Sequence, residues 1–520
     1  MARVILSILL TIFVLGGFSF APAQTSDPAW STATFDKLPR WRGFNLLNKF
    51  MVSGNTPFDE ADFRMIHGWG FNFVRIPMDY RIWITGGDWT KIDETAAFKD
   101  LDQAMAWGEK YRVHICLNFH RAPGYTVASP PETRSLWTDP EAQRVCAMHW
   151  AAFARHFKGI PNERLSFDLF NEPANIDAQT YVKVVAIVAA AIRAEDPDRL
   201  IICDGLQWGN VPVPELIPLH VAQSLHDYLP IELTHYHASW MEGSSTWPVP
   251  TWPMLKGMPG FLYGPEKPEL QSAMTIKQPF NLSFPAGTKL VLRVGTVSDH
   301  AHFVVRADGQ VVFEKTFVSG SQATQGEKIV YKPEYKTYQN IFSQNETVTL
   351  PKEAGVITIC NDDGDWMTLE SLSIQVSPDK PVYPLSLAAD WGKKQVALTF
   401  QPDVADRPWE GGGKWINREW IYEHEILPWR RMNTVAEMTQ HQGVGIMVGE
   451  FGCFNQTPDE VTMRWMADTL SEFKAMGWGW ALWNLKGSFG ILDSDRPGAV
   501  YQDFEGHKLD TRMLQLLQEN

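Results

Sequence analysis

The sequence is poor in cysteine and has no Cys-x-x-Cys motif of the kind that binds metals. Its 520 residues include only five cysteines. So few cysteines do not build a disulfide scaffold, and Cys116, Cys203 and Cys453 lie in or beside apolar runs typical of strands. We therefore expect buried free thiols that act as small hydrophobic residues, with one disulfide left open as an alternative.

The chain also lacks a cluster of basic residues. Lys and Arg number 46 against 60 Asp and Glu, which gives a net charge of -14. A surface that binds nucleic acid needs clustered positive charge, so this class of partner is excluded. Hydrophobic residues make up 44% and charged residues 20%, which indicates a globular protein long enough for two or three domains.

No long hydrophobic run follows the one at the amino terminus. Arg3 gives that segment a positive start, residues 4–20 are nearly all apolar, and Ala21-Pro22-Ala23 fits a small-residue cleavage site. The pattern predicts a signal peptide over residues 1–23 and a secreted or periplasmic monomer without membrane contact after cleavage. A membrane anchor is the alternative, because the run is near the lower limit for spanning.

Short apolar runs alternate with amphipathic stretches, a pattern typical of βαβ units. The predicted strands are 41–45, 71–77, 113–120, 165–171, 200–204, 232–237, 445–451 and 478–484. The predicted helices lie near 58–68, 95–110, 140–157, 177–195, 213–225, 423–442, 458–475 and 508–518. Eight such strands fit a closed (β/α)8 barrel of the TIM type, and the Gly-rich phosphate turn that often marks an open doubly wound sheet is missing.

The middle of the chain changes character. Between about residues 268 and 380, short β-rich runs separated by turn residues predict an all-β sandwich inserted between the sixth and seventh barrel strands. The predicted division is a first barrel part over 24–266, the insert over 267–380 and a second barrel part over 381–520. The insert either binds carbohydrate or acts as a spacer. The acidic stretch 361–365 predicts a solvated turn, with a calcium site as the alternative.

Polar side chains recur where predicted barrel strands end, which is where barrels carry their functional groups. Glu172 and Glu450 each follow a buried apolar run, and a carboxylate there is costly unless it is used or neutralised. Paired carboxylates are the working groups of glycoside hydrolysis. The other strand-end residues are Arg75, His120, Asn171, His235, His237 and Trp483.

Six motifs occur in an order that resembles glycoside hydrolase family 5, the cellulase family. They are Trp41-Arg42-Gly43-Phe44-Asn45, Phe73-Val74-Arg75-Ile76-Pro77, Asn118-Phe119-His120, Phe170-Asn171-Glu172-Pro173, Gly449-Glu450-Phe451-Gly452 and Trp480-Ala481-Leu482-Trp483. The resemblance covers nearly the whole chain outside the predicted signal peptide and insert.

The resemblance implies a retaining mechanism, with Glu172 as general acid/base and Glu450 as nucleophile. Arg75 would hold Glu450 ionised, so that Glu172 keeps the proton that the pair shares. Asn171 would bond the sugar 2-hydroxyl. Of the remaining strand-end residues, His120 and His235 would line the sugar site and Trp483 would stack under the sugar.

One position departs from the family pattern. The family usually has a Tyr two residues after the strand-six His, where it bonds the nucleophile, and His235-Tyr236-His237 places a His at that spacing. Residues two apart on a strand face the same side, so we expect His237 to contact Glu450. Such a His predicts a sharper loss of activity below about pH 6 than a Tyr would give.

Tryptophan is abundant, with 22 residues. Trp240, Trp247 and Trp252 follow the predicted sixth strand, and Trp391, Trp409, Trp415 and Trp420 follow the insert. Aromatic rings stack well on sugars, so these residues either form sugar subsites or pack the insert against the barrel.

The expected function is that of a secreted retaining β-glycosidase without metal or cofactor. The first expectation for its activity is endo-β-1,4-glucanase on a β-glucan, with a β-mannanase, a xyloglucanase or a β-1,3-glucanase left open. Two alternatives come from other classes: a metal-dependent barrel hydrolase that uses His235, His237, His114 and His120, and a non-catalytic glycan-binding protein.

Overall fold

The computed structural model describes residues 30–322, 327–402, 404, 408–438 and 443–520. The predicted signal peptide over 1–23 lies outside the described residues and stays a prediction. In the described part of the chain, no helix is both long and apolar enough to cross a membrane.

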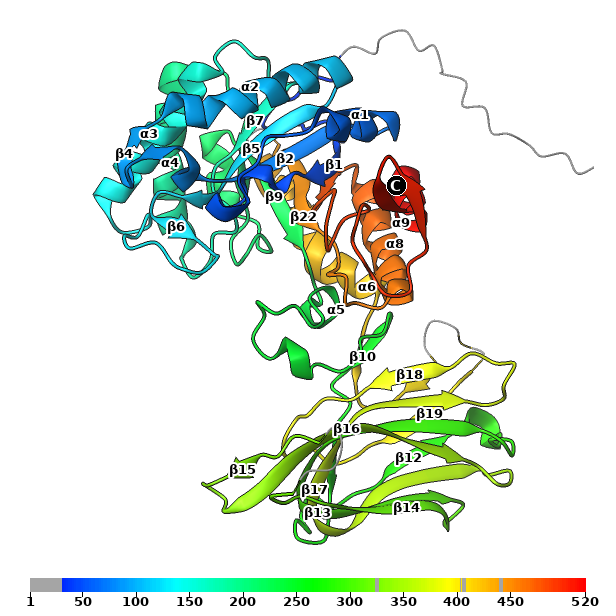
Figure 1. Cartoon of the computed structure of the whole chain (residues 1–520). Coiled ribbons are helices and arrows are strands. Elements are labelled where there is room, and N and C mark those ends of the chain that lie inside the picture. Colours follow the sequence, from blue (N-terminus) through cyan, green and yellow to red (C-terminus); the bar gives the residue numbers. More distant parts are fainter. Residues whose placement is uncertain (1–29, 323–326, 403, 405–407, 439–442) are drawn as a thin grey trace, which may run out of the picture.

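Eight parallel strands of the described chain form one closed barrel (Figure 1). Hydrogen bonding runs in the order β2-β1-β23-β22-β9-β8-β7-β5, and a β2–β5 pairing closes the ring. The strands are β1 (Arg42–Asn45), β2 (Phe73–Asp79), β5 (His114–Ala122), β7 (Leu165–Asp168), β8 (Ile201–Asp204), β9 (Ala222–Asp227), β22 (Ile446–Phe451) and β23 (Gly479–Leu482). The predicted barrel is confirmed.

Long helices surround the barrel, each between two of its strands or at the end of the chain. They are α1 (Glu60–Gly68), α2 (Glu94–Tyr111), α3 (Pro140–His156), α4 (Ala178–Glu195), α7 (Leu427–Met438), α8 (Asp459–Met476) and α9 (Thr511–Glu519). Five of them begin after an aspartate whose side chain accepts a hydrogen bond from the first turn, namely Asp59, Asp93, Asp139, Asp177 and Asp510. These caps fix where the helices begin.

The predicted sixth strand is wrong. Residues 232–237 overlap the short helix α5 (Ile231–Thr234), and the barrel strand is β9, which overlaps the end of the stretch 213–225 where a helix was predicted. Pro214 and Pro218 limit that stretch to the 3-10 helix η4 (Pro214–Leu219), because a proline inside a helix removes a hydrogen bond. Every residue of β9 is buried, as in a barrel strand packed on both faces.

The helix predicted near 423–442 has a more complex form. It begins as α6 (Arg418–Ile421), passes through a π-helical turn, η7 (Tyr422–Ile426), and continues as α7. Residues 439–442 lie outside the described residues.

A β-rich module joins the barrel between β9 and β22, as predicted for the insert. The chain leaves the barrel through β10 (Met254–Lys256) and returns through β21 (Lys414–Ile416), and these two strands pair antiparallel. Figure 1 shows the module below the barrel, joined to it at this two-stranded ribbon. The module has its own hydrophobic core, which reaches from Leu255 to Trp409. It therefore extends beyond the predicted 267–380.

The strands of the module are β11 (Phe261–Tyr263), β12 (Met274–Lys277), β13 (Lys289–Ala307), β14 (Gln310–Val318), β15 (Tyr331–Lys332), β16 (Thr337–Thr349), β17 (Val356–Gln375), β18 (Tyr383–Ser386), β19 (Ala397–Phe400) and β20 (Trp409–Glu410). Three strands of the module, β13, β16 and β17, are much longer than the short runs that were predicted. The acidic stretch 361–365, predicted as a turn, lies within β17 at register shifts against β13. Its carboxylates have protein partners: Asp362 pairs with Arg306, and Asp365 accepts a 2.6 Å hydrogen bond from Ser298.

Five short strands of the described chain lie outside the barrel ring and the module. The strands are β3 (Ile84–Thr85), β4 (Asp88–Ile92), β6 (Tyr125–Thr126), β24 (Tyr501–Phe504) and β25 (His507–Asp510).

All five cysteines are buried and free, which confirms that the thiols act as small core residues.

Candidate active site

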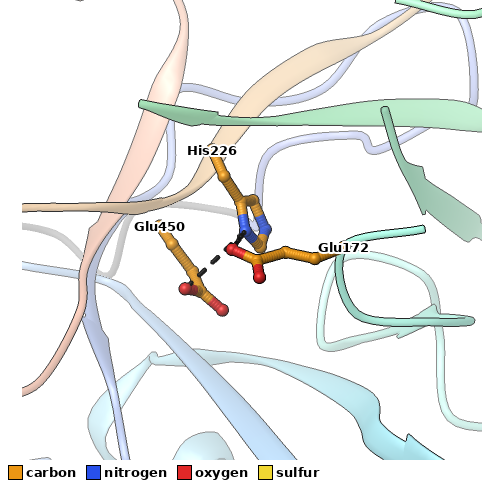
Figure 2. Close-up of side chains that lie close together, drawn as sticks. All are labelled: Glu172, His226 and Glu450. Atoms are coloured by element: carbon orange, nitrogen blue, oxygen red, sulfur yellow. Dashed lines mark hydrogen bonds and ion pairs between the residues drawn. The ribbon is translucent and has the colours of Figure 1, made fainter. Parts of the chain in front are cut away.

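Two carboxyl groups face each other at the carboxyl ends of the barrel strands. Glu172 lies four residues after the last residue of β7, and Glu450 lies in β22. A ligand oxygen of each, together with a ring nitrogen of His226, lies within 4.8 Å of the other two (Figure 2). The folded chain therefore brings together the two residues that were predicted to form a pair.

Glu450 is almost fully buried and receives hydrogen bonds from two sides. Arg75 Nη1 donates to its Oε1 at 2.6 Å, and the Tyr228 hydroxyl donates to its Oε2 at 3.0 Å. Burial raises the pKa of Glu450 to about 7, against the opposing positive charges of His226 and Arg75. Donors aimed at a carboxylate favour its ionised form, so these contacts offset part of the cost of burial.

Arg75 is the fixed cation of the site. It extends from β2, and Nε donates to Asp168 at 2.8 Å while Nη2 donates to Asn171 Oδ1 at 3.0 Å. Burial alone would lower its pKa, but the charges of Asp168, Glu450 and Asp204 raise it. Because several partners hold the guanidinium, its position relative to Glu450 is set by the barrel.

Glu172 stands on a constrained backbone. Its φ is +51°, in the left-handed region that non-glycine residues seldom adopt. Two contacts hold the backbone there: its amide donates to Asp204 Oδ2 at 3.0 Å, and its carbonyl accepts from the Tyr125 hydroxyl at 2.6 Å. The side chain of Glu172 is 16% exposed against 4% for Glu450. Glu172 is therefore the more accessible acid of the pair.

His226 lies between the acids. Its Nδ1 is 3.0 Å from Glu172 Oε1 and 3.6 Å from Glu450 Oε2, and its Nε2 is 3.1 Å from Asp204 Oδ2. Burial would lower the pKa of His226, but the charges of Asp204 and Glu450 and the hydrogen bonds with Asp204 and Glu172 raise it well above its ordinary value. A carboxylate oxygen close to each ring nitrogen favours the protonated form of this imidazole.

The sequence analysis missed His226 and Tyr228. Both extend from the end of β9, the strand that the analysis misplaced, and His226-Asp227-Tyr228 has the His-x-Tyr spacing of the family. Burial, followed by the charge of Glu450, raises the pKa of Tyr228 well above its ordinary value, so its hydroxyl stays a donor. The expected departure from the family pattern is therefore absent.

The predictions for His235 and His237 need correction, because neither lies on a barrel strand. His237 is exposed at a φ of +58°, and its ring stacks on Tyr236, so it does not take the position next to Glu450. His235 ends α5 and packs its ring edge-on against Tyr228, with 5.0 Å between ring centroids. It supports the residue that contacts Glu450 and does not itself contact either acid in the described structure.

Other predicted site residues present unused polar atoms. Asn171 Nδ2 and His120 Nδ1 are buried and have no hydrogen-bond partner among the described residues. Burial, with the charge of Arg75, lowers the pKa of His120 well below its ordinary value, which keeps its ring neutral. Trp483 is half-buried, and its ring centroid lies 5.6 Å from that of His120 and 5.6 Å from that of Phe50.

A cavity of about 240 Å³ lies where β1 and β23 end, next to this cluster. Its lining includes Asn45, whose side chain accepts a hydrogen bond from Arg75, and Lys486, whose Nζ is 2.6 Å from Asp62. Polar residues from the loops after two neighbouring strands thus extend the site along one edge of the barrel.

The tryptophans that flank the barrel divide into two groups. Trp252 and Trp409 are buried at 4% and 1% exposure, so packing is their main role. Trp240 is 57% exposed, and its ring contacts His235, Phe454 and Phe489. It offers an open aromatic face beside the residues that support Tyr228.

The donor set at the acid pair does not suit a metal ion. Arg75 is bonded to Glu450, and the pKa of His226 is raised well above its ordinary value by the neighbouring carboxylates, so the contacts of the acids already favour positive charge beside them. A second group of close ligand atoms, Glu266, Asp299 and His300, lies in the insert. His235 and His237 belong to neither of the groups found among the described residues.

A closed (β/α)8 barrel whose strand ends bring two carboxyl groups face to face has the architecture of a barrel glycoside hydrolase. Residues 31–262 match the family model described as Cellulase (glycosyl hydrolase family 5). These residues, less than half of the chain, form a glycoside hydrolase family 5 domain.

Individual relatives agree with this assignment. Endoglucanase C of Acetivibrio thermocellus is 27% identical over 213 residues, which cover 39% of this chain and 61% of the relative. The chain therefore spans less than two thirds of the length of that curated relative. A crystal structure titled as that of a glycoside hydrolase is 27% identical, with a TM-score of 0.58, and the match covers 92% of this chain and 99% of that one.

One more distant structure supports the fold alone. It is Thermotoga maritima Cel5A, solved in complex with mannotriose, which is 16% identical with a TM-score of 0.50 and covers 92% of this chain and 97% of that one.

Proposed function

We propose that this protein is a retaining, cellulase-type β-glycosidase that hydrolyses a β-linked polysaccharide. The observation that carries the proposal is the approach of Glu172 and Glu450 oxygens to within 4.8 Å. Retaining enzymes hold their carboxyl groups about 5–5.5 Å apart, whereas inverting enzymes leave about 6.5–9.5 Å for a water molecule.

In the first step, Glu450 acts as the nucleophile. Its carboxylate attacks the anomeric carbon and forms a glycosyl ester, while Glu172 gives its proton to the departing oxygen. The contacts support this division, because Arg75 and Tyr228 both donate to Glu450 and so favour its anion. Glu172 is the more exposed acid and can reach the leaving group.

In the second step, water breaks the ester. Glu172, now ionised, takes a proton from the water, whose oxygen attacks the anomeric carbon and releases Glu450. His226 bonds Glu172, and Tyr125 and Asp204 hold its backbone, so the acid keeps one position through both steps. The product retains the configuration of the substrate.

The unused polar atoms suit a bound sugar. Asn171 Nδ2 donates a hydrogen bond to the sugar 2-hydroxyl, and this contact strengthens in the transition state. His120 Nδ1 accepts or donates to a neighbouring hydroxyl, and Trp483 forms the apolar platform beside it. Further sugars occupy the cavity lined by Asn45 and Lys486 on one side and the face of Trp240 on the other.

A β-1,4-glucan is the proposed substrate, and internal cleavage the proposed action. The support is that relatives aligned with part of the chain are endoglucanases by name. The proposal includes export as a monomer, which rests on the apolar run and small-residue site at residues 4–23. Product analysis on β-1,4-glucan, β-mannan, xyloglucan and β-1,3-glucan separates the candidates.

Two substitutions test the chemistry. Glu172→Gln and Glu450→Gln should each abolish turnover of an aryl β-cellobioside. Azide should restore cleavage by the Glu450→Gln variant when the substrate carries a more activated aryl leaving group. Glu195→Gln removes a surface carboxylate that pairs with Arg155 and serves as the control. Proton NMR of the first product should show the β-anomer.

Appearance of the α-anomer first would refute the retaining mechanism. Full activity in either glutamine variant would refute the assignment of the pair. Activity that a strong chelator removes and zinc restores would favour the metal-dependent alternative.

A further inference from the structure

A second cavity lies at the seam between the β-rich module and the barrel, away from the acid pair. Its volume is about 370 Å³, within the range of small-molecule sites. The residues that carry the argument are Trp252, Tyr383, Trp409 and Trp415 on one side and Glu460 and Arg464 of α8 on the other. None of them contacts Glu172 or Glu450.

The aromatic side of the cavity is held in place. Trp252 Nε1 donates to Asp468 at 2.8 Å, which ties this ring to α8. The Tyr383 hydroxyl donates to the carbonyl of Pro402 at 2.9 Å. Trp415 is half-buried on β21, the strand that returns to the barrel. Rings fixed by such contacts form a preformed apolar surface, which lowers the entropic cost of binding.

One polar atom of the lining is unused. Trp409 is 1% exposed, and its Nε1 has no hydrogen-bond partner in the described part of the chain. A buried donor without an acceptor costs free energy, and an acceptor group on a bound molecule would remove that cost. This unpaired indole N–H therefore favours a ligand that carries an oxygen acceptor.

The opposite wall is polar and balanced in charge. Glu460 and Arg464 are both exposed on the first turns of α8, and Glu460 also pairs with Arg512 at 2.7 Å. The Glu460 carboxylate accepts hydrogen bonds and the Arg464 guanidinium donates them, and their charges are opposite. Together they favour a neutral ligand with several hydroxyl groups over an ion. Apolar rings facing polar groups across one cavity match the two kinds of surface that a sugar ring has.

The position of the cavity relates it to the catalytic end of the barrel. In a βα unit the helix begins near the carboxyl end of the strand before it, and α8 follows β22, the strand of Glu450. Glu460 and Arg464 lie within the first two turns of α8, so the cavity flanks the barrel on the side where the site opens.

We propose that this seam cavity is a non-catalytic binding site for a neutral β-linked oligosaccharide. The half-buried ring of Trp415 stacks on a sugar face, the buried Trp252 helps to line the cavity, and Trp409 Nε1, Arg464 and Glu460 bond hydroxyl groups. The ligand bridges the module and α8, so one chain of the polysaccharide is held beside the barrel while another part enters the active site.

The test is calorimetric titration of the Glu450→Gln protein with cellotetraose, which this variant should not hydrolyse. We expect two sites per chain. Trp415→Ala and Arg464→Ala on that background should each weaken one site at least tenfold and leave the other unchanged. Trp409→Phe, which keeps the ring and removes the N–H, should weaken the same site about threefold to tenfold.

Trp391→Ala is the matched control, because Trp391 is a 56% exposed tryptophan of the module that does not line the cavity. Each variant is also made with Glu450 intact, where unchanged aryl β-cellobioside turnover shows that the barrel folds. One site per chain, or two sites that none of the three substitutions changes, would overturn the proposal. Loss of catalysis with Glu172→Gln tests the active site separately, so the two proposals fail independently.

Discussion

A buried acid pair behind the sixth barrel strand predicts how stability changes with pH. Asp227 lies on β9 between His226 and Tyr228, so its side chain faces the opposite way, out of the barrel. It is fully buried, and a backbone contact at Leu229 offsets only part of the cost of that burial. Burial raises the pKa of Asp227 from 3.8 to about 7. Burial and the charge of Asp227 raise the pKa of Glu425, in the π-helical turn, to about 9.

The direction of the pH effect on stability follows from which state, folded or unfolded, binds more protons. The unfolded chain loses the Asp227 proton near pH 4, and the folded chain keeps it until about pH 7. Between these values the folded state binds more protons, so the free energy of unfolding falls as pH rises. A displacement from 3.8 to about 7 corresponds to on the order of 4 kcal/mol at most. Glu425 extends the same trend to higher pH.

Asp227→Asn should remove this contribution. The amide is uncharged at every pH, so the variant gains stability relative to the parent as pH rises from 5 to 8, by on the order of 2–4 kcal/mol. The assay is thermal and denaturant unfolding of both proteins at pH 5, 6.5 and 8. Asp198→Asn, at an exposed aspartate, is the control and should give a difference that does not vary with pH.

A difference between Asp227→Asn and the parent that is constant across this range would refute the reasoning. A difference that shrinks as pH rises would show that Asp227 is ionised in the folded protein with a partner that stabilises its charge.

Three further predictions concern the active site. Tyr228→Phe removes the 3.0 Å hydrogen bond to Glu450, so kcat/KM should fall about 10- to 100-fold. The acid limb of its pH profile should move to higher pH, because the Glu450 anion loses a donor. An acid limb that does not move would count against this contact. His237→Tyr should leave the pH profile unchanged, because His237 is exposed and Tyr228 already bonds Glu450, and a shifted acid limb would revive the role first predicted for His237. Asn171→Ala should lower kcat/KM on an aryl glucoside on the order of 10- to 100-fold and change little on the 2-deoxy analogue; equal losses on both would show that Asn171 acts only by holding Arg75.

Much of the barrel could be predicted because its strands carry strong local patterns. The apolar runs before Glu172 and Glu450 are long, and each ends in a polar residue and a turn former, so strand and site residue are marked together. The two acids could be paired for the same reason. Parallel barrel strands all end at one rim, so residues at two strand ends share a site even when the chain separates them widely.

The sixth strand could not be found from apolar periodicity. Residues 222–227 include Gln223, Ser224 and Asp227, and in the structure all are buried by partners that a local reading does not see. Gln223, for example, exchanges hydrogen bonds with the backbone of Val213. The stretch 232–237 was predicted as a strand, but it follows Pro230 and begins within a turn of helix. The His-x-Tyr spacing at residues 226 and 228 was the available signal.

The bounds of the module were missed for a related reason. Long strands β13 and β17 bend at register shifts, so the sequence shows them only as short β-rich runs, and the stretch 361–365 inside β17 was predicted as a turn. Where Gly364 lies in β17, its φ is +82° and a side chain would meet the backbone of His300. An acidic, glycine-containing stretch of this kind resembles a turn in sequence, although in space it is a bend in a paired strand.

The position of β9 links these observations to function. His226 and Tyr228 face the acids, while Asp227, between them, faces the buried Glu425, so one strand end connects the active site with the π-helical turn. The chain leaves for the module soon after this strand, at β10, and returns through β21 directly before α6 and the π-helical turn. The return connection of the module therefore leads into the helix that carries Glu425, whose neighbour Asp227 lies at the strand end of His226 and Tyr228. If ionisation of Asp227 and Glu425 loosens that strand end, activity and the stability of the barrel should decline together at alkaline pH, and Asp227→Asn should extend both. A variant that gains stability at pH 8 without gaining activity there would show that the strand end holds the acids independently of the pair behind it.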